Sequence, residues 1–159
     1  MGTFTGAKSD RSLAVEMFGD VDAFPSEARD VVLIKKGARV GGSYLSALYA
    51  LWRMLTAPLE RLAPGEIAVA LIVAPDLRLA RQTMRFALGA ARKLGVAIES
   101  ETADAFTVVR DNGQRVGCEC LPATRGGSAV RGRTLLCAIL SEAALFRDDS
   151  FIVNDTAIY

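Results

Sequence analysis

The chain of 159 residues contains no histidine, the residue on which many catalytic and metal sites depend. Triads that use an imidazole, a histidine general base and histidine-bearing zinc sites are therefore excluded. Only three cysteines occur, and an odd number does not build a disulfide framework. Cys118 and Cys120 stand two apart in a segment predicted as a strand, where they are poorly placed to bond to each other. We therefore expect a reducing environment.

Long apolar runs and a strong charge of one sign are lacking as well. No run approaches the roughly 20 apolar residues of a membrane helix, and residues 1–20 lack the apolar core of a signal peptide. Nineteen basic and eighteen acidic residues leave a net charge of +1, so any polyanion must be bound by a local cluster. We expect a soluble, cytoplasmic protein with no membrane partner, and the 51% apolar content suffices for one globular domain.

What is present is an alternation of apolar runs with amphipathic segments. The runs are short and uninterrupted, which predicts buried strands at residues 31–34, 67–73 and 135–140. Helical spacing predicts a helix from Ser43 until just before Pro58 and a second one over residues 77–94. Buried strands that alternate with helices predict an α/β domain whose parallel sheet is covered on both faces.

The first predicted helix carries apolar residues at helical spacing: Leu45, Leu48, Trp52 and Leu55. We expect its aromatic residues Tyr44, Tyr49 and Trp52 to pack in the core rather than to stack on bases.

Between residues 106 and 121 the pattern changes to alternation, which is typical of an antiparallel hairpin. Asn112 and Gly113 are suited to the positive φ angles of a two-residue turn between its strands. Residues 122–134 contain glycines and arginines and predict a loop before the last apolar run. We therefore expect a hairpin inserted into the α/β pattern.

The loop between the first predicted strand and helix approaches the phosphate-binding pattern G-x-x-x-x-G-K-[ST]. That pattern places successive backbone N–H groups and a helix N-terminus around a polyphosphate. In this frame the chain has Lys36, Gly37, Ala38, Arg39, Val40, Gly41, Gly42 and Ser43. Lysine stands at the position of the first glycine, and Gly42 stands at the position of the lysine.

This exchange is compatible with phosphate binding because the loop brings its first position back near its last. The long side chain of Lys36 can reach the β- and γ-phosphates, and the Ser43 hydroxyl can bind Mg²⁺. Arg39 can stabilise charge on the γ-phosphoryl group as an arginine finger supplied in cis. The alternative is that the glycines form only a strand-to-helix turn, and the loop alone leaves both interpretations open.

The last apolar run ends at Ser141 and Glu142, where P-loop motors carry an acidic pair. In such a pair the first carboxylate holds the Mg²⁺ shell and the second activates water. Glu142 can serve as the base, whereas Ser141 replaces the first acid, so turnover is expected to suffer. Alternatively, Glu142 is the N-terminal acid of a following helix.

Taken in order, these features resemble the ATPase domain of the large terminase subunit of tailed bacteriophages, the DNA-packaging motor. Residues 36–43 resemble that family's variant loop, in which the lysine stands at the start. Residues 72–76 with residues 80–82 resemble its second motif. In that family a glycine-arginine segment precedes the acidic pair, and residues 127–133 precede residues 139–146 in the same way. The resemblance spans about residues 24–159.

The resemblance implies an α/β P-loop NTPase domain of the ASCE type, a three-layer sandwich with a mainly parallel sheet and an inserted hairpin. Residues 25–159 would form this domain after a leader of residues 1–24, and we expect the domain to continue beyond Tyr159. ATP and Mg²⁺ are the implied cofactors.

Carried over by position, Walker A residues 36–43 would bind ATP. Lys36 would contact phosphate, Arg39 would stabilise the γ-phosphoryl group, Ser43 and Ser141 would lie at the metal, and the Walker B residue Glu142 would activate water.

The implied activity is ATP hydrolysis that drives double-stranded DNA into procapsids, in the cytoplasm of a bacterial host that carries the phage or prophage. The implied partners are the portal protein, the small terminase subunit, DNA and further copies of the chain in a ring. Candidate DNA contacts are Arg125, Arg131 and Arg133 of the glycine loop and, on the second helix, Arg78, Arg81, Arg85 and Arg92. A solvated helix flank is the alternative for the second helix.

Two other functions remain open from the sequence. One is a hydrolysis-impaired P-loop remnant that binds nucleotide or mediates assembly, and the other is a helicase-like translocase.

Overall fold

The computed structural model describes residues 12, 15, 31–35, 40–60, 62–63, 65–123 and 132–146. The chain divides into two compact units, Met1–Gly37 and Ala38–Tyr159. The helices and strands of the second unit are α2 (Gly42–Thr56), β1 (Ala68–Ala74), α3 (Leu77–Lys93), β2 (Ala97–Glu101), β3 (Ala105–Val109), β4 (Arg115–Pro122), β5 (Leu135–Leu140) and the short 3₁₀ helix η4 (Ala143–Leu145).

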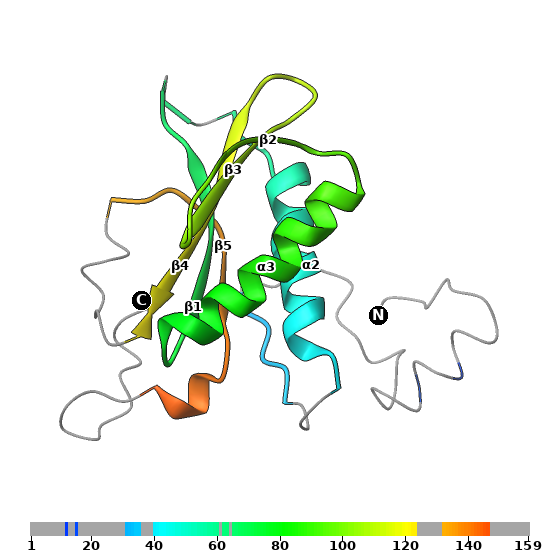
Figure 1. Cartoon of the computed structure of the whole chain (residues 1–159), viewed down its shortest axis with the longest axis vertical. Coiled ribbons are helices and arrows are strands. Elements are labelled where there is room, and N and C mark those ends of the chain that lie inside the picture. Colours follow the sequence, from blue (N-terminus) through cyan, green and yellow to red (C-terminus); the bar gives the residue numbers. More distant parts are fainter. Residues whose placement is uncertain are drawn as a thin grey trace. The chain divides into compact units, whose positions relative to one another are not determined.

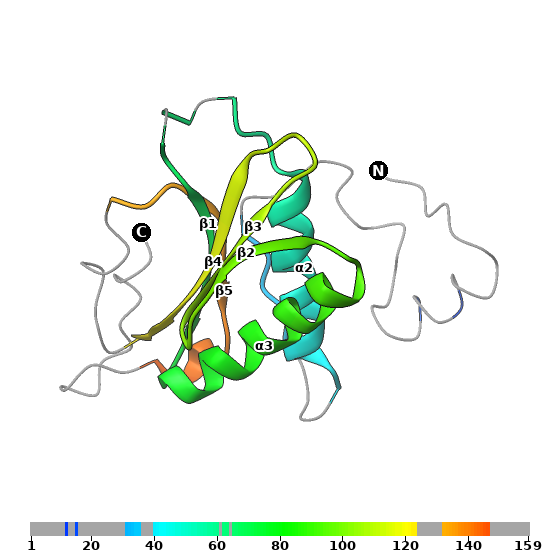
Figure 2. The same ribbon diagram turned by 45° about the horizontal axis from the view of Figure 1, so that its top comes forward.

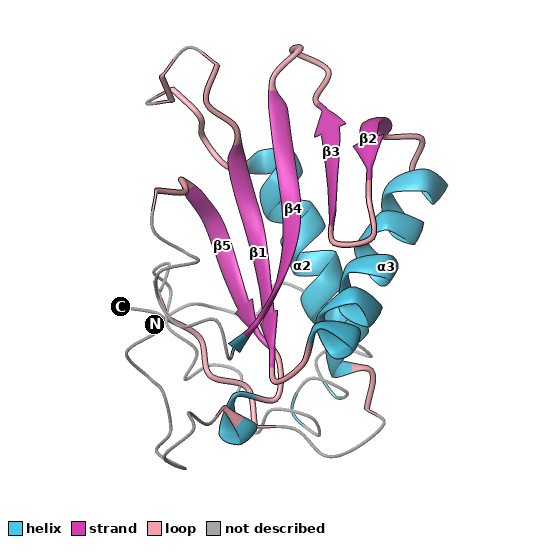
Figure 3. Ribbon diagram, turned by 60° about the vertical axis from the view of Figure 1, so that its left-hand side comes forward, coloured by secondary structure: helices cyan, strands magenta, loops and turns pink. Residues whose placement is uncertain are grey.

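The strands form one mixed sheet in the order β2-β3-β4-β1-β5 (Figure 3). Strand β1 lies between β4 and β5 and runs parallel to both. Strand β3 runs antiparallel to both of its neighbours, β2 and β4. The second half of the predicted hairpin is therefore no insertion beside the sheet, because β4 pairs directly with the central strand. The α/β class is confirmed, with a mixed sheet in place of the mainly parallel one.

Helices α2 and α3 cover the same face of this sheet (Figures 1 and 2). All seven residues of β1 are buried, as its uninterrupted apolar sequence predicts. Ala70 and Ile72 face the core beneath the two helices, together with Phe106 of β3. On the opposite face Leu71 and Val73 pack with Leu121 of β4, Ala123 and Phe146. In the part of the chain that the structure describes, no helix is long and apolar enough to cross a membrane.

Four predicted elements are confirmed. Each could be predicted because its signals lie close together in the sequence. The predicted helices correspond to α2 and α3, and the runs at residues 67–73 and 135–140 correspond to β1 and β5. The Asp76 side chain caps α3 by accepting a hydrogen bond from Leu79 N (2.9 Å). Gly95 follows the last turn of α3 with a φ of 71°, the left-handed conformation that ends many helices.

The predicted buried strand at residues 31–34 is wrong. These residues belong to neither a helix nor a strand, and their side chains are 61–91% exposed. A strand needs a neighbour to accept and donate its backbone hydrogen bonds, and none of the strand pairs in the described residues includes this segment.

Helix α2 does not bury the apolar stripe that its spacing suggests. The buried residues are Ala47, Ala50, Leu51 and Met54. Tyr44, Tyr49 and Trp52, predicted to pack in the core, are 50%, 46% and 53% exposed. The helix is apolar on nearly all sides, so periodicity could not select a face. The small alanines face inward because they let α2 approach α3 and the sheet closely.

The turn between β3 and β4 also differs from the prediction. Gly113 N donates to Arg110 O (2.8 Å), so Asp111 and Asn112 occupy the centre of the turn, and only Gly113 has a positive φ, of 80°. The turn is therefore longer than two residues, with glycine in the left-handed position that follows it.

Candidate functional site

Helix α2 begins without a capping side chain. Its N-cap is Gly41, at φ 78° and ψ 9°, and the first turn contains no acidic residue. Gly41 O accepts a hydrogen bond from Leu45 N (3.0 Å), whereas the backbone N–H groups of the first turn receive no side-chain cap. Ser43 lies in this turn, and its hydroxyl makes no hydrogen bond within the described residues. An uncapped helix start of this kind is suited to an anion.

The left-handed conformation explains why a glycine stands at position 41. A Cβ built on Gly41 would meet nothing within 4 Å, so space does not require the glycine. The positive φ does, because a side chain there is strained.

Strand β5 ends at the second predicted site. Ser141 N donates to Val73 O (2.8 Å), so Ser141 continues the pairing of β5 with β1. Glu142 then adopts φ 57° and ψ 41°, the only positive φ of a non-glycine residue in the described part of the chain. It precedes η4, but its side chain does not cap that helix. Glu142 therefore stands at the N-terminus of a short helix, as the alternative interpretation expects, and its left-handed backbone is of a kind that also marks functional sites.

These two segments lie at the same edge of the sheet. Strands β1, β4 and β5 all end at this edge, and α2 and α3 both begin there (Figures 1 and 3). Open α/β sheets bind ligands at the carboxyl ends of their parallel strands, beside the point where the strand order reverses. Here the chain turns to one side of β1 for β4 and to the other side for β5.

Half of the predicted loop and two of the predicted DNA contacts lie outside the described residues. These positions are Lys36, Gly37, Ala38, Arg39, Arg125 and Arg131. Val40, Gly41, Gly42, Ser43, Arg133, Ser141 and Glu142 are described.

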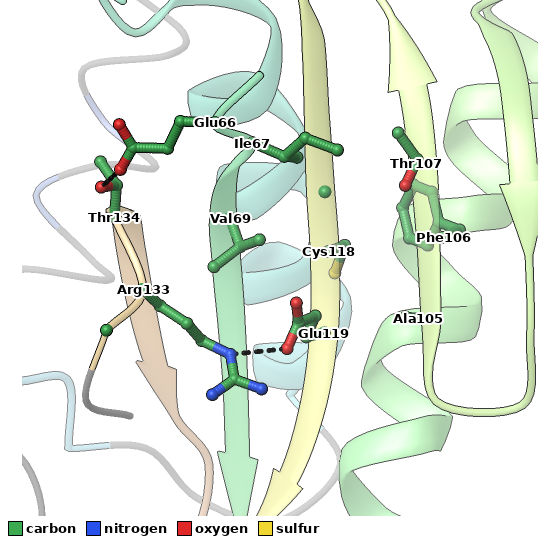
Figure 4. Close-up of a pocket in the computed structure, with 12 residues that line it drawn as sticks. Glu66, Ile67, Val69, Ala105, Phe106, Thr107, Cys118, Glu119, Arg133 and Thr134 are labelled. Carbon is green, nitrogen blue, oxygen red and sulfur yellow. Dashed lines mark hydrogen bonds and ion pairs between the residues drawn. The ribbon is translucent and has the colours of Figure 1, made fainter. Parts of the chain in front are cut away.

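Arg133 lies away from the edge where α2 begins, because it precedes β5 rather than following it. Its Nε donates to Glu119 Oε2 (2.8 Å) across the face of the sheet that the helices leave open (Figure 4). The pair lines a cavity of about 280 Å³ near the start of β1. Glu66 lies on the rim of this cavity, and its hydrogen bond from Thr134 lowers its carboxyl pKa. Sequence patterns could not predict this cavity, because its residues from β1, β3 and β4 meet only in the folded sheet.

Two of the predicted DNA-binding arginines of α3 form ion pairs within the domain. Arg81 Nε lies 2.5 Å from Asp104 Oδ1, and this hydrogen-bonded pair raises the pKa of the guanidinium. Arg92 pairs with Glu101 of β2.

Two of the three cysteines, Cys118 and Cys120, are buried free thiols, and Cys137 is half-buried. Burial raises the pKa of Cys120 to about 12 and that of Cys137 to about 11, and it also raises the pKa of Cys118. Among the described residues, no group of three or more histidine, cysteine or acidic residues could hold a metal ion. A Mg²⁺ site built from serine hydroxyls, phosphate oxygens and water does not need such a group.

Comparison of the chain with protein-family models, with curated proteins and with solved structures finds no match.

Proposed function

We propose that this chain is an ATP-binding and ATP-hydrolysing domain of the large terminase type, which drives double-stranded DNA into procapsids. One observation carries the proposal: an uncapped helix start with a left-handed glycine and a strand end with a strained glutamate share one edge of the sheet. The first suits a phosphate group, and the second suits a residue that acts on water.

The residue types that the sequence assigns to this site match the needs of phosphoryl transfer. Backbone N–H groups of Gly42 and Ser43 would surround the β-phosphate, while Lys36 and Arg39 would supply positive charge. Glu142 would orient the attacking water, and Ser43 would hold Mg²⁺. When bound, Mg²⁺ neutralises charge on the β- and γ-phosphate oxygens. The exposed segment 31–34 adds no support, so the proposal depends on the helix start and the strand end.

A hydrolysis-impaired remnant is the second candidate, and Ser141 favours it. This residue occupies the position of the acid that would hold the Mg²⁺ shell, and its backbone N–H is already bound to Val73 O. A hydroxyl there supplies no negative charge, which allows nucleotide binding without turnover.

The test combines titration of Mg-ATP and Mg-ADP with measurement of phosphate release on the full chain. Lys36→Ala should lower nucleotide affinity at least tenfold, whereas its neighbour Lys35→Ala should change it little. Glu142→Gln should retain binding and reduce phosphate release on the order of a hundredfold. Glu60→Gln, an exposed acid beyond the other end of α2, is the matched control.

Failure of the unaltered chain to bind either nucleotide would contradict the proposal. Binding without phosphate release would select the remnant.

A further inference from the structure

Helix α3 carries a positive charge that the packing of the domain does not use. Its 17 residues include four arginines and one lysine and no acidic residue. Two of these cations are neutralised locally, since Arg81 pairs with Asp104 and Arg92 pairs with Glu101. Arg78, Arg85 and Lys93 are exposed and form no ion pair with any described residue.

These three cations lie along one line of the helix, opposite its buried side. At 3.6 residues per turn, the spacings of seven and eight residues place them within about 80° of one another around the axis. The buried residues Ala80, Met84, Ala87 and Ala91 occupy the other side. With a rise of 1.5 Å per residue, the successive cations are spaced roughly 10 and 12 Å apart along the axis.

Gly89 lies in the middle of this line. It is exposed in the interior of a helix, where glycine is about 1 kcal/mol less favourable than alanine. Packing does not explain it, because an added Cβ would meet nothing within 4 Å and its φ is not positive. A glycine without an internal reason marks a place where another molecule can approach the helix backbone closely.

We propose that the α3 stripe, formed by Arg78, Arg85, Gly89 and Lys93, binds the sugar-phosphate backbone of duplex DNA. The core of a protein interface is depleted of charge and built around apolar or aromatic anchors. The α3 stripe consists of cations and a glycine, which suits a row of phosphates, and the exposed Phe86 beside it packs edge-on against Tyr44 of α2. The spacing of its cations is similar to the roughly 12 Å width of the major groove, whose two edges are phosphate backbones.

This inference deepens the proposed function, on which it rests for the choice of DNA as the polyanion. Contacts to phosphate alone hold a duplex without reading its sequence, as a translocating motor requires. Binding at the α3 stripe does not require nucleotide.

Binding of a fluorescent 30-base-pair duplex to the full chain, measured without nucleotide over a range of salt concentrations, tests the inference. The triple variant Arg78→Gln, Arg85→Gln, Lys93→Gln should bind on the order of a hundredfold more weakly at ~0.1 M salt. The slope of log affinity against log salt should fall by about 2.7 for three lost phosphate contacts. Arg115→Gln removes an exposed arginine that pairs with Glu99 outside the stripe and should change affinity less than twofold.

Gly89→Ala is a variant that keeps all charges. It should raise the Tm by a few degrees, because alanine favours the helix, and should weaken DNA binding several-fold. Unchanged DNA binding in the triple variant would overturn the inference, as would equally effective competition by polyglutamate. Nucleotide titration of the triple variant separates the two proposals. If the triple variant binds both ATP and DNA as the unaltered chain does, only the DNA-binding role of the α3 stripe is contradicted. If the unaltered chain never binds ATP but the triple variant loses DNA binding, only the proposed ATPase is contradicted.

Discussion

Helices α2 and α3 begin at the same edge of the sheet and rest on the same face, yet their first turns are completed in different ways. The start of α3 is closed by Asp76, whose carboxylate accepts the Leu79 N–H at 2.9 Å. The start of α2 has Gly41 in a left-handed conformation and no side-chain cap. The chain itself thus supplies an acceptor to the backbone N–H groups of α3, whereas no side chain in the described residues caps those of α2.

The capped start of α3 stabilises the helix, whereas the uncapped start of α2 is suited to binding. Both helices have comparable support, since each packs on β1 and β4 as well as on the other helix. The open start of α2 therefore does not result from poor packing of the helix. Asp76 therefore serves the stability of α3, whereas the left-handed conformation of Gly41 stands where the proposed nucleotide would bind.

Alkaline unfolding tests whether the shared face beneath the helices is dry. Cys118, Cys120 and Cys137 lie on that face, and burial raises their pKa values, to about 12 for Cys120 and about 11 for Cys137. The folded state favours the protonated thiols, so their contribution is complete below pH 9 and is lost as the pH rises through 9 toward 12. Each thiol should then lower the free energy of unfolding by about 1.4 kcal/mol per pH unit.

Urea denaturation at pH 8, 9, 10 and 11 measures this loss. Cys120→Ala should reduce the change in unfolding free energy with pH. An identical change per pH unit in that variant would show that water reaches the thiols on this face. At pH 8 the thiols of the native chain should react slowly with a disulfide reagent and rapidly after unfolding.

Gly41→Val addresses the open start of α2 directly. A β-branched residue at a φ of 78° should cost about 2 kcal/mol of stability and lower ATP affinity at least tenfold. Gly95→Val is a matched control, because Gly95 has a φ of 71°, has no atom within 4 Å of its Cβ position, and follows the far end of α3. Chemical denaturation and nucleotide titration should show a similar loss of stability in both variants, with a loss of affinity only in the first. Equal affinity in the two variants would contradict a ligand site at Gly41.

Asp76→Ala should have the smallest effect of these changes. Loss of the cap should cost about 1 kcal/mol of unfolding free energy, while ATP affinity stays unchanged because the start of α3 holds no ligand. Asp76→Asn retains an oxygen acceptor and should restore most of the stability. A fall in ATP affinity in Asp76→Ala would mean that both helix starts contribute to binding.

The elements that the sequence predicted well are those with local signals. Asp76 and Gly95 bracket α3 within a few residues of its ends, and β1 is a continuous apolar run. Two elements that flank the predicted site also form as expected, since Gly41 precedes α2 and Glu142 follows β5, whereas the site itself stays a prediction.

Strand β2 was missed because most of its residues are exposed and it has no apolar run. Its position depends on pairing with β3 and on two ion pairs, Glu99 with Arg115 and Glu101 with Arg92, which connect residues distant in the sequence. The cavity beside Arg133 and Glu119 could not be predicted for the same reason.

The sequence by itself determined where α2, α3, β1 and β5 begin and end, because caps, glycines and apolar periodicity act over a few residues. Only the tertiary structure decided which side of α2 is buried, which strands flank β1, and which arginines of α3 are neutralised. Those outcomes depend on the shapes and charges of segments brought together by folding, and a one-dimensional pattern does not contain them.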